Sequence, residues 1–262
     1  MLAHSRAEIL VCLQRFRSRD YRETLGELVP ELAERDWHAE RFPRLHEVVL
    51  VGDEPPLPGT WSVADLLRGA SAVPPPAAAV TSAGDDAFVL YTSGSSARPK
   101  AVPLTHGALI ENGFGIGERM ELTGADRVFV SVPLFWAYGA VNALPATLSH
   151  GAALVLQEAF EPAGALDRIE RHRCTAIYTL PNMTAALLAA DGFDPARVAS
   201  LRTGLTIGTP LELRSVIDDL GVAGICNIYG GTETYGNCCV TPAAWPRERR
   251  EQTQGLDRKS VV

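Results

Sequence analysis

Short runs of apolar, mostly β-branched residues alternate along this chain with stretches of helical periodicity. Such alternation is typical of a mostly parallel sheet covered by helices, so we expect an α/β fold. The predicted strands are residues 8–12, 48–51, 87–91, 128–132, 153–157, 175–180, 201–206 and 224–228. The predicted helices are residues 163–173, 181–190 and 211–220. Residues 53–86 are rich in proline, which cannot join a sheet ladder, and are predicted to form a surface excursion.

Charge and apolar patterning exclude two classes of partner. The formal net charge is −7 and no stretch gathers five basic residues, so the chain should repel nucleic-acid backbones. The longest weakly polar stretch, residues 137–156, is interrupted by polar residues and a proline, and no integral membrane span is expected.

An odd number of cysteines without metal or disulfide spacing indicates a cytoplasmic location, with Cys174 and Cys226 in the core.

A strand that runs into a hydroxyl-rich loop is the most informative segment. We expect a buried strand at residues 87–91, and a loop of small and hydroxyl residues follows it up to Lys100. Small side chains let backbone N–H groups approach phosphate oxygens, and the lysine adds positive charge. The loop is not a Walker A motif, because alanine follows the lysine. The residues expected to bind phosphate are Thr92, Ser93, Gly94, Ser95, Ser96 and Lys100.

A second apolar strand, residues 224–228, ends in a glycine-rich turn that carries an aromatic ring, a hydroxyl and a carboxylate. Its sequence is Tyr-Gly-Gly-Thr-Glu, from Tyr229 to Glu233. Magnesium is usually held by one or two carboxylates together with phosphate oxygens, so this turn has the chemistry of a metal–nucleotide site. Alone it would be weak evidence, but two such turns in one chain support each other.

Together the two turns resemble the signatures of the adenylate-forming superfamily, in particular acyl-coenzyme A synthetases. The first differs from the usual Tyr-Thr-Ser-Gly-Thr-Thr-Gly-x-Pro-Lys-Gly by serines at 95 and 96 and alanines at 97 and 101. We expect negative φ at Ala97, because a methyl group opposes the left-handed region. The resemblance implies that Lys100, Thr232 and Glu233 are catalytic, with Glu233 holding Mg²⁺ and Tyr229 stacking on adenine. The wider nucleotide contacts it implies are Gly208, Thr209, Pro210, Asn227, Ile228, Tyr229, Gly230, Gly231 and Thr232.

The acyl side is suggested by residues 132–139, which resemble the family's Pro-Leu-Phe-His-x-x-Gly segment. Trp136 stands at the histidine position, where a bulky ring could gate an acyl pocket, although core packing explains it equally well. The pocket residues implied by analogy are Trp136, Tyr138, Tyr178, Asn182 and Thr206. We expect His106 to begin a helix after Thr105 rather than to act in catalysis.

The resemblance covers residues 1–256, which correspond to part of the family's large N-terminal domain. Residues 257–262 resemble a translated sequencing adapter, and we expect them to be non-native. The family's small C-terminal lid domain, with its catalytic lysine, would lie beyond them.

The resemblance implies an ATP-dependent ligase that converts a carboxylic acid into an acyl-adenylate and then into a thioester of coenzyme A. ATP, Mg²⁺ and coenzyme A are the implied cofactors and co-substrates, and the chain alone is expected to be inactive or impaired. Two alternatives stay open. One is an amino-acid-activating domain of a peptide synthetase, which would pass its product to a carrier protein. The other is a non-enzymatic, truncated nucleotide-binding chain.

Overall fold

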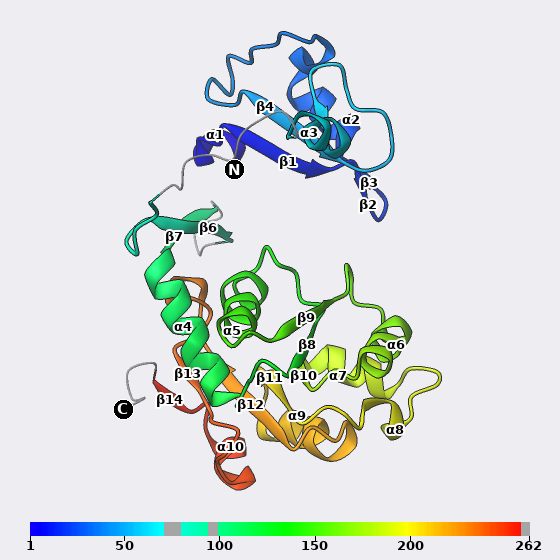
Figure 1. Cartoon of the computed structure of the whole chain (residues 1–262), viewed down its shortest axis with the longest axis vertical. Helices are drawn as coiled ribbons and strands as arrows, with labels where there is room; N and C mark the ends of the chain where they lie inside the picture. Colours follow the sequence, from blue (N-terminus) through cyan, green and yellow to red (C-terminus); the bar gives the residue numbers. More distant parts are fainter. Residues whose placement is uncertain (71–79, 94–98, 258–262) are drawn as a thin grey trace. The chain divides into compact units, whose positions relative to one another are not determined.

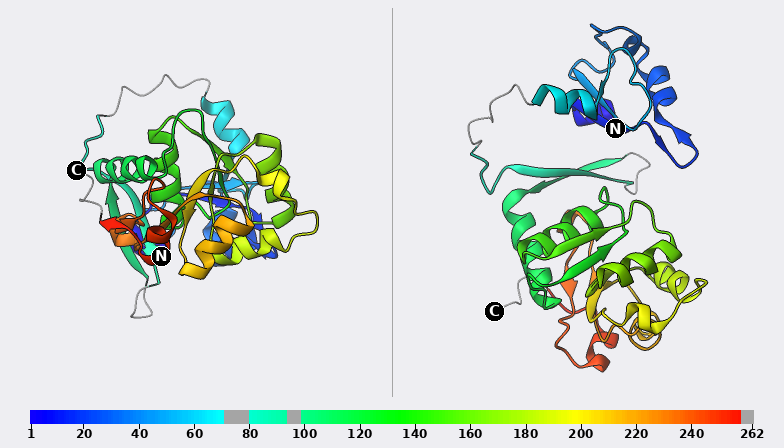
Figure 2. Two further views of the ribbon diagram at one scale, coloured as in Figure 1. Left: turned by 90° about the horizontal axis from the view of Figure 1, so that it is seen from below. Right: turned by 45° about the vertical axis from the view of Figure 1, so that its right-hand side comes forward.

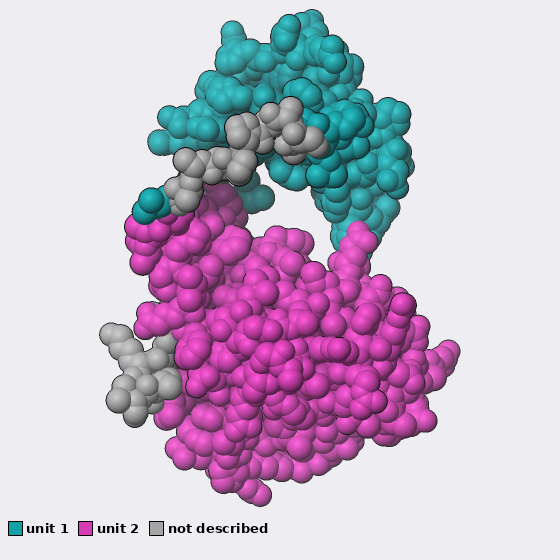
Figure 3. Space-filling view, in the orientation of Figure 1, with its two compact units in different colours: residues 1–80 teal, residues 81–262 magenta. Residues whose placement is uncertain are grey.

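The computed structural model describes residues 1–70, 80–93 and 99–257. The chain divides into two compact units, Met1–Val80 and Thr81–Val262, which Figure 3 shows in different colours. Within the described residues, no helix is both long and apolar enough to cross a membrane.

The first unit is built on a parallel sheet of three strands in the order β1 (Ile9–Leu13), β4 (Glu47–Val51), β5 (Trp61–Ser62). One short hairpin, β2 (Arg15–Phe16) and β3 (Arg19–Asp20), leads into the helix α2 (Tyr21–Leu28). Asp20 starts α2 by accepting hydrogen bonds from the N–H groups of Arg22 and Glu23. The remaining elements are α1 (Leu2–Ser5), η1 (Pro30–Ala33) and α3 (Val63–Ala70).

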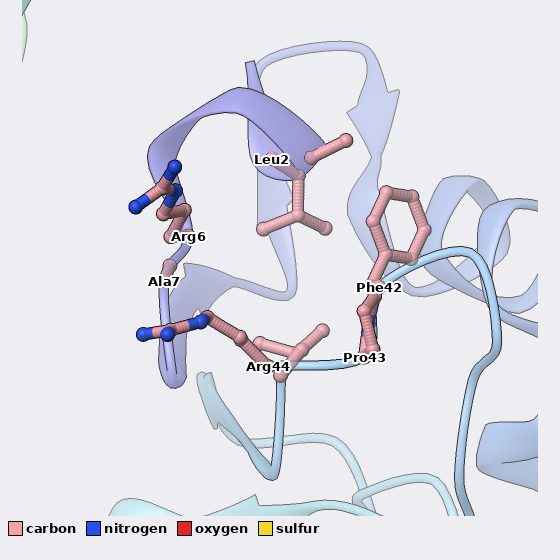
Figure 4. Close-up of a pocket in the computed structure, with 8 residues that line it drawn as sticks. Leu2, Arg6, Ala7, Phe42, Pro43 and Arg44 are labelled. Atoms are coloured by element: carbon pink, nitrogen blue, oxygen red, sulfur yellow. The ribbon is translucent and has the colours of Figure 1, made fainter.

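The predicted surface excursion at residues 53–86 is wrong over part of its length, because β5 and α3 lie inside it. Prolines occupy only the two flanks, so the stretch between them is free to form a strand and a helix. A cavity of about 200 Å³ lies elsewhere in this unit, between α1 and the segment before β4 (Figure 4). Its walls are apolar, with Arg6 and Arg44 beside them.

The second unit contains a sheet of seven strands in the order β14-β13-β12-β11-β10-β8-β9. The five strands from β9 to β12 are parallel, and β13 and β14 extend the sheet in antiparallel fashion. The bounds are β8 (Arg127–Val130), β9 (Ala153–Leu156), β10 (Ala176–Tyr178), β11 (Thr203–Thr206), β12 (Gly224–Tyr229), β13 (Cys239–Val240) and β14 (Leu256–Asp257). The α/β class and all five parallel strands are therefore as predicted.

Helices cover both faces of this sheet (Figures 1 and 2). Alternate strand residues such as Val128 and Val130 pack beneath α4 (His106–Arg119) and α5 (Leu144–Ser149). Phe129 and Ile177 point to the opposite face, under α6 (Pro162–His172), α7 (Pro181–Leu188) and α8 (Pro195–Val198). Cys174 and Cys226 are buried as predicted, and burial raises the pKa of their thiols to about 11 and about 12.

Two local predictions need correction. The strand β6 (Asp86–Thr92) is not buried: it pairs only with β7 (Lys100–Thr105) in a two-stranded antiparallel sheet, and Val89 is 48% exposed. Residues 211–220 form the short helix α9 (Pro210–Arg214) followed by the π-helical turn η3 (Ser215–Asp219). Leu213, Val216 and Leu220 face the core at ordinary helical spacing, whereas Leu211 lies on the opposite face and is 74% exposed. His106 does begin α4, as predicted.

Candidate active site

A row of buried polar residues crosses the parallel sheet at the carboxyl ends of its strands. The row runs from β9 across to β12 and consists of Gln157, Ser131, Thr179, Thr206 and Asn227. Gln157, Ser131 and Thr179 each come directly after the last paired residue of their strand, and Thr206 pairs with Asn227 in the ladder between β11 and β12. Ligands of open α/β sheets bind outside this edge, so the sheet places its polar groups where a site is expected.

The first turn joins β6 to β7. Thr92 and Lys100 are opposite each other in the ladder, so the hairpin brings together the two ends of the hydroxyl-rich loop. Ser93 and Lys100 are both exposed. Gly94, Ser95, Ser96 and Ala97 lie outside the described residues, and with them the predicted backbone of Ala97.

The second turn follows β12 and is closely packed. Tyr229 is 58% exposed at the end of the strand, and Thr232–Thr234 form the 3₁₀ turn η4. A Cβ added at Gly230 would lie 2.5 Å from the backbone nitrogen of Asn237, so only glycine fits there. The hydroxyl of Thr234 bridges the N–H and the carbonyl oxygen of Gly231, at 3.1 and 2.9 Å. Glu233 remains exposed and forms no ion pair with any described residue.

Hydrogen bonds that the sequence did not indicate hold β7 and α4 against the second turn. The N–H of Thr105, at the end of β7, donates to the hydroxyl of Tyr235 over 3.1 Å. The buried amide of Asn112 in α4 donates to the carbonyl oxygen of the same tyrosine, also over 3.1 Å. The strand that carries Lys100 is therefore held against the turn that carries Glu233. A polar residue within the apolar helical pattern around Leu109 and Ile116 was the available signal.

The loop after β11 joins the same edge. The side-chain amide of Asn227 forms two hydrogen bonds with the backbone of Gly208. Its Oδ1 accepts from the Gly208 N–H at 3.2 Å, and its Nδ2 donates to the Gly208 carbonyl oxygen at 3.1 Å. Thr209 caps α9 in a reciprocal capping box with Glu212, and Pro210 occupies the first helical position. Gly208, Thr209, Asn227 and the end of β12 are thus brought together at one edge of the sheet.

The expected acyl segment has an exposed part and a buried part. Leu134, Phe135 and Trp136 are exposed, with the two rings in an edge-to-face contact 5.8 Å apart. The hydroxyl of Tyr138 lies 2.7 Å from the carbonyl oxygen of Leu205, at the end of β11. Burial raises the pKa of that hydroxyl well above its ordinary value.

The other three expected pocket residues are divided in the same way. Tyr178 and Thr206 are fully buried in the strands beneath the segment, so neither side chain reaches solvent in this structure. Asn182 is exposed in the first turn of α7.

Comparison with known proteins agrees with this geometry. The sequence profile of the AMP-binding enzyme family matches residues 1–258. The chain belongs to the AMP-binding enzyme family. Its relatives include the acyl-CoA ligase SID4 of Ajellomyces capsulatus, 32% identical over 246 residues that cover 90% of this chain and 40% of the relative. The mouse (Mus musculus) mitochondrial medium-chain acyl-CoA ligase ACSF2 is 28% identical over 262 residues, covering 94% of this chain and 42% of the relative.

The fold is shared with solved members of the family. The crystal structure of the anthranilate CoA ligase AuaEII, in complex with anthranoyl-AMP, superposes with a TM-score of 0.79 at 23% identity. The match covers 98% of this chain and 46% of that protein. This chain therefore has the α/β architecture of an acyl-CoA ligase N-terminal domain, and it spans less than half the length of these proteins.

The donor set at the second turn suits Mg²⁺ bound together with a nucleotide. Among the described residues no cluster of three or more His, Cys, Asp or Glu could hold a metal ion by itself. Glu233 offers one exposed carboxylate, and Mg²⁺ commonly takes one or two carboxylates and completes its shell with phosphate oxygens and water. The residues present fit a metal that arrives with its phosphates.

Proposed function

We propose that this chain forms the ATP-binding part of an enzyme that activates a carboxylic acid as its acyl-adenylate and transfers the acyl group to coenzyme A. The observation that carries the proposal is the connection of the Lys100 strand to the Glu233 turn through Thr105, Asn112 and Tyr235. These bonds hold the end of β7 that is distant from Lys100 against the turn that carries Glu233, and this supports a shared site for the two signatures.

The proposed reaction has two steps. A carboxylate oxygen attacks the α-phosphorus of ATP, the bond to the bridging oxygen breaks, and pyrophosphate leaves. The thiol of coenzyme A then attacks the acyl carbonyl, loses its proton, and displaces AMP. Both steps need alignment of reactants and neutralisation of phosphate charge more than they need a protein nucleophile.

Different residues would bind the phosphates, neutralise their charge and contact the adenine. Lys100 supplies positive charge beside the loop at residues 92–96, which would hold the β- and γ-phosphates, and Thr232 would bond the α-phosphate. Tyr229, exposed at the end of β12, offers its ring to adenine. Mg²⁺, held by Glu233, would neutralise charge on the phosphate oxygens when bound.

Coenzyme A is the acceptor we favour over a carrier protein, because the relatives named above are CoA ligases. A cytoplasmic location remains part of the proposal. It is consistent with five free cysteines, because free thiols persist in a reducing compartment.

Calorimetric titration of ATP into the 262-residue chain, with and without Mg²⁺, tests the nucleotide site. We expect Mg²⁺ to tighten binding, and Glu233→Gln to remove most of that gain, about tenfold or more, because the neutral amide is a poor ligand for a hard cation. In the full-length enzyme, carboxylate-dependent exchange of labelled pyrophosphate into ATP should be lost when Glu233 is replaced in the same way.

The matched control is Glu248→Gln, which removes one exposed carboxylate from α10 (Arg247–Gln252) without touching the turn. It should bind ATP as the parent chain does. If the parent chain shows no ATP binding, or if Glu233→Gln retains the full effect of Mg²⁺, the proposed site is wrong.

A further inference from the structure

The segment directly after Glu233 has a backbone that requires support. Tyr235 has φ of 59° and Gly236 has φ of +73°, so two consecutive residues occupy the left-handed region. A tyrosine pays a steric penalty there, and such conformations persist only where the surroundings enforce them. The support for this segment comes from two buried asparagines, on two different helices.

Asn112 supports the segment from α4. Its side chain is 1% exposed, and both ends of its amide contact the turn. The Nδ2 group donates to the carbonyl oxygen of Tyr235 at 3.1 Å, and Oδ1 accepts from the side chain of Asn237 at 3.3 Å. Neither bond stabilises α4 itself, so the asparagine acts on the turn.

Asn142 supports the segment from a second element. It lies in the π-helical turn η2 (Tyr138–Ala143) and is fully buried. Its Nδ2 group donates to the carbonyl oxygen of Gly236 at 3.4 Å, and its Oδ1 accepts from the hydroxyl of Tyr178 at 3.0 Å. A Cβ on Gly236 would come 3.3 Å from the carbonyl oxygen of Ala137, so η2 packs directly against the turn. Short π-helical insertions are frequent at functional sites.

We propose that Asn112 and Asn142 are positioning residues that fix Thr232 and Glu233 in the geometry needed for the magnesium–nucleotide complex. The proposal rests on the proposed function for its consequence, but the positioning itself is a property of the free chain. Through Asn142 and Tyr178, the segment expected to contact the acyl group is also connected to the nucleotide turn.

Hydrogen exchange of the free chain tests the positioning without any ligand. The amides of residues 234–238 all donate to carbonyl oxygens within the turn or at Tyr229, so their exchange rates report its order. Asn112→Leu and Asn142→Leu remove the amide groups at similar volume and should accelerate exchange there at least tenfold. The matched control is Thr147→Val, a buried residue of α5 that bonds only to the carbonyl oxygen of Ala143 in its own helical run.

A milder variant keeps the test decisive if a leucine variant fails to fold. Tyr178→Phe removes the hydroxyl that donates to Asn142 and leaves both asparagines in place. It should accelerate exchange at residues 234–238 by about threefold to tenfold, with the rest of the sheet unchanged. Exchange equal to that of the control would overturn the proposal.

Mg²⁺-dependent ATP binding then tests the consequence. Asn112→Leu or Asn142→Leu should raise the Mg²⁺ concentration needed for half-maximal tightening at least threefold, while binding of ATP without Mg²⁺ stays within twofold. A variant that loosens the turn but keeps the parental Mg²⁺ dependence would show that these asparagines do not position Glu233. Failure of the parent chain to bind ATP would instead contradict the proposed function and leave the exchange result standing.

Discussion

The two turns of the candidate site look alike in sequence but are supported in different ways. Each follows a strand and combines small residues with hydroxyl and charged groups. The first closes the two-stranded β6–β7 hairpin, whose strands are largely half-exposed and which packs on α4 and η2 through Val102 and Leu104. The second follows β12, which has a neighbouring strand on each side, and it is held by side chains from α4 and η2 and by the backbone N–H of Thr105 in β7. A motif therefore predicts the chemistry of a turn better than it predicts what holds the turn in place.

The largest contrast should come from two adjacent glycines of the second turn. An alanine at Gly230 places its methyl 2.5 Å from the backbone nitrogen of Asn237, which must move, whereas at Gly231 the nearest atom is the flexible carboxylate of Glu233 at 3.4 Å. Gly230→Ala should lower the free energy of unfolding by about 2–3 kcal/mol, and Gly231→Ala by less than about 1 kcal/mol. Urea denaturation measures both.

Gly231→Ala is the control for this pair, because it adds the same methyl group one residue away. Equal losses in the two variants would show that the turn can shift as a whole, and the close packing inferred between Gly230 and Asn237 would then be wrong.

A second contrast compares the hairpin with the central sheet through one substitution. Val128 in β8 is fully buried, whereas Val89 in β6 is 48% exposed. Val128→Ala should cost about 2 kcal/mol, from lost burial and the cavity left behind, and Val89→Ala less than about 0.5 kcal/mol. Thermal and urea unfolding give both values. A similar cost at Val89 would mean that β6 is more closely packed than this structure shows.

Much of the sheet could be predicted because its sequence signal is local. Three of the parallel strands of the second unit, β8, β10 and β12, are largely apolar runs buried on both faces, and such runs are distinctive in any sequence. The motif residues at their carboxyl ends followed from that placement, since parallel strands share one edge. Asn227 and Gly208 were expected at one site and are joined there by two hydrogen bonds.

What the sequence concealed depends on contacts between distant residues. Asn112 and Asn142 are separated from the turn by about a hundred residues or more, and an asparagine inside a helix gives no local sign of its partner. The hairpin was misjudged as buried because Ala87–Tyr91 has the composition of a core strand, although it has only β7 beside it. The change from α9 to η3 likewise occurs without a proline or glycine at the junction that could have indicated it.

The smallest effect should be found beside the second turn, at the capping box of α9. Hydrogen bonds from the backbone N–H and then the hydroxyl of Thr209 lower the pKa of Glu212 below its ordinary value of 4.5. A lowered pKa in the folded state means that this stabilisation is complete above pH 4.5 and is lost as the pH falls through the lowered value.

Thr209→Ala should therefore cost about 1 kcal/mol at neutral pH, and Glu212→Gln somewhat less. Urea denaturation from pH 7 to pH 3 should show the gap between Glu212→Gln and the parent closing, while the exposed control Glu248→Gln shows no such trend. If the difference in free energy of unfolding between Glu212→Gln and the parent stays constant across that range, the charge of Glu212 does not stabilise the loop beside Asn227. The close packing of the second turn would then not extend beyond β12 to this loop.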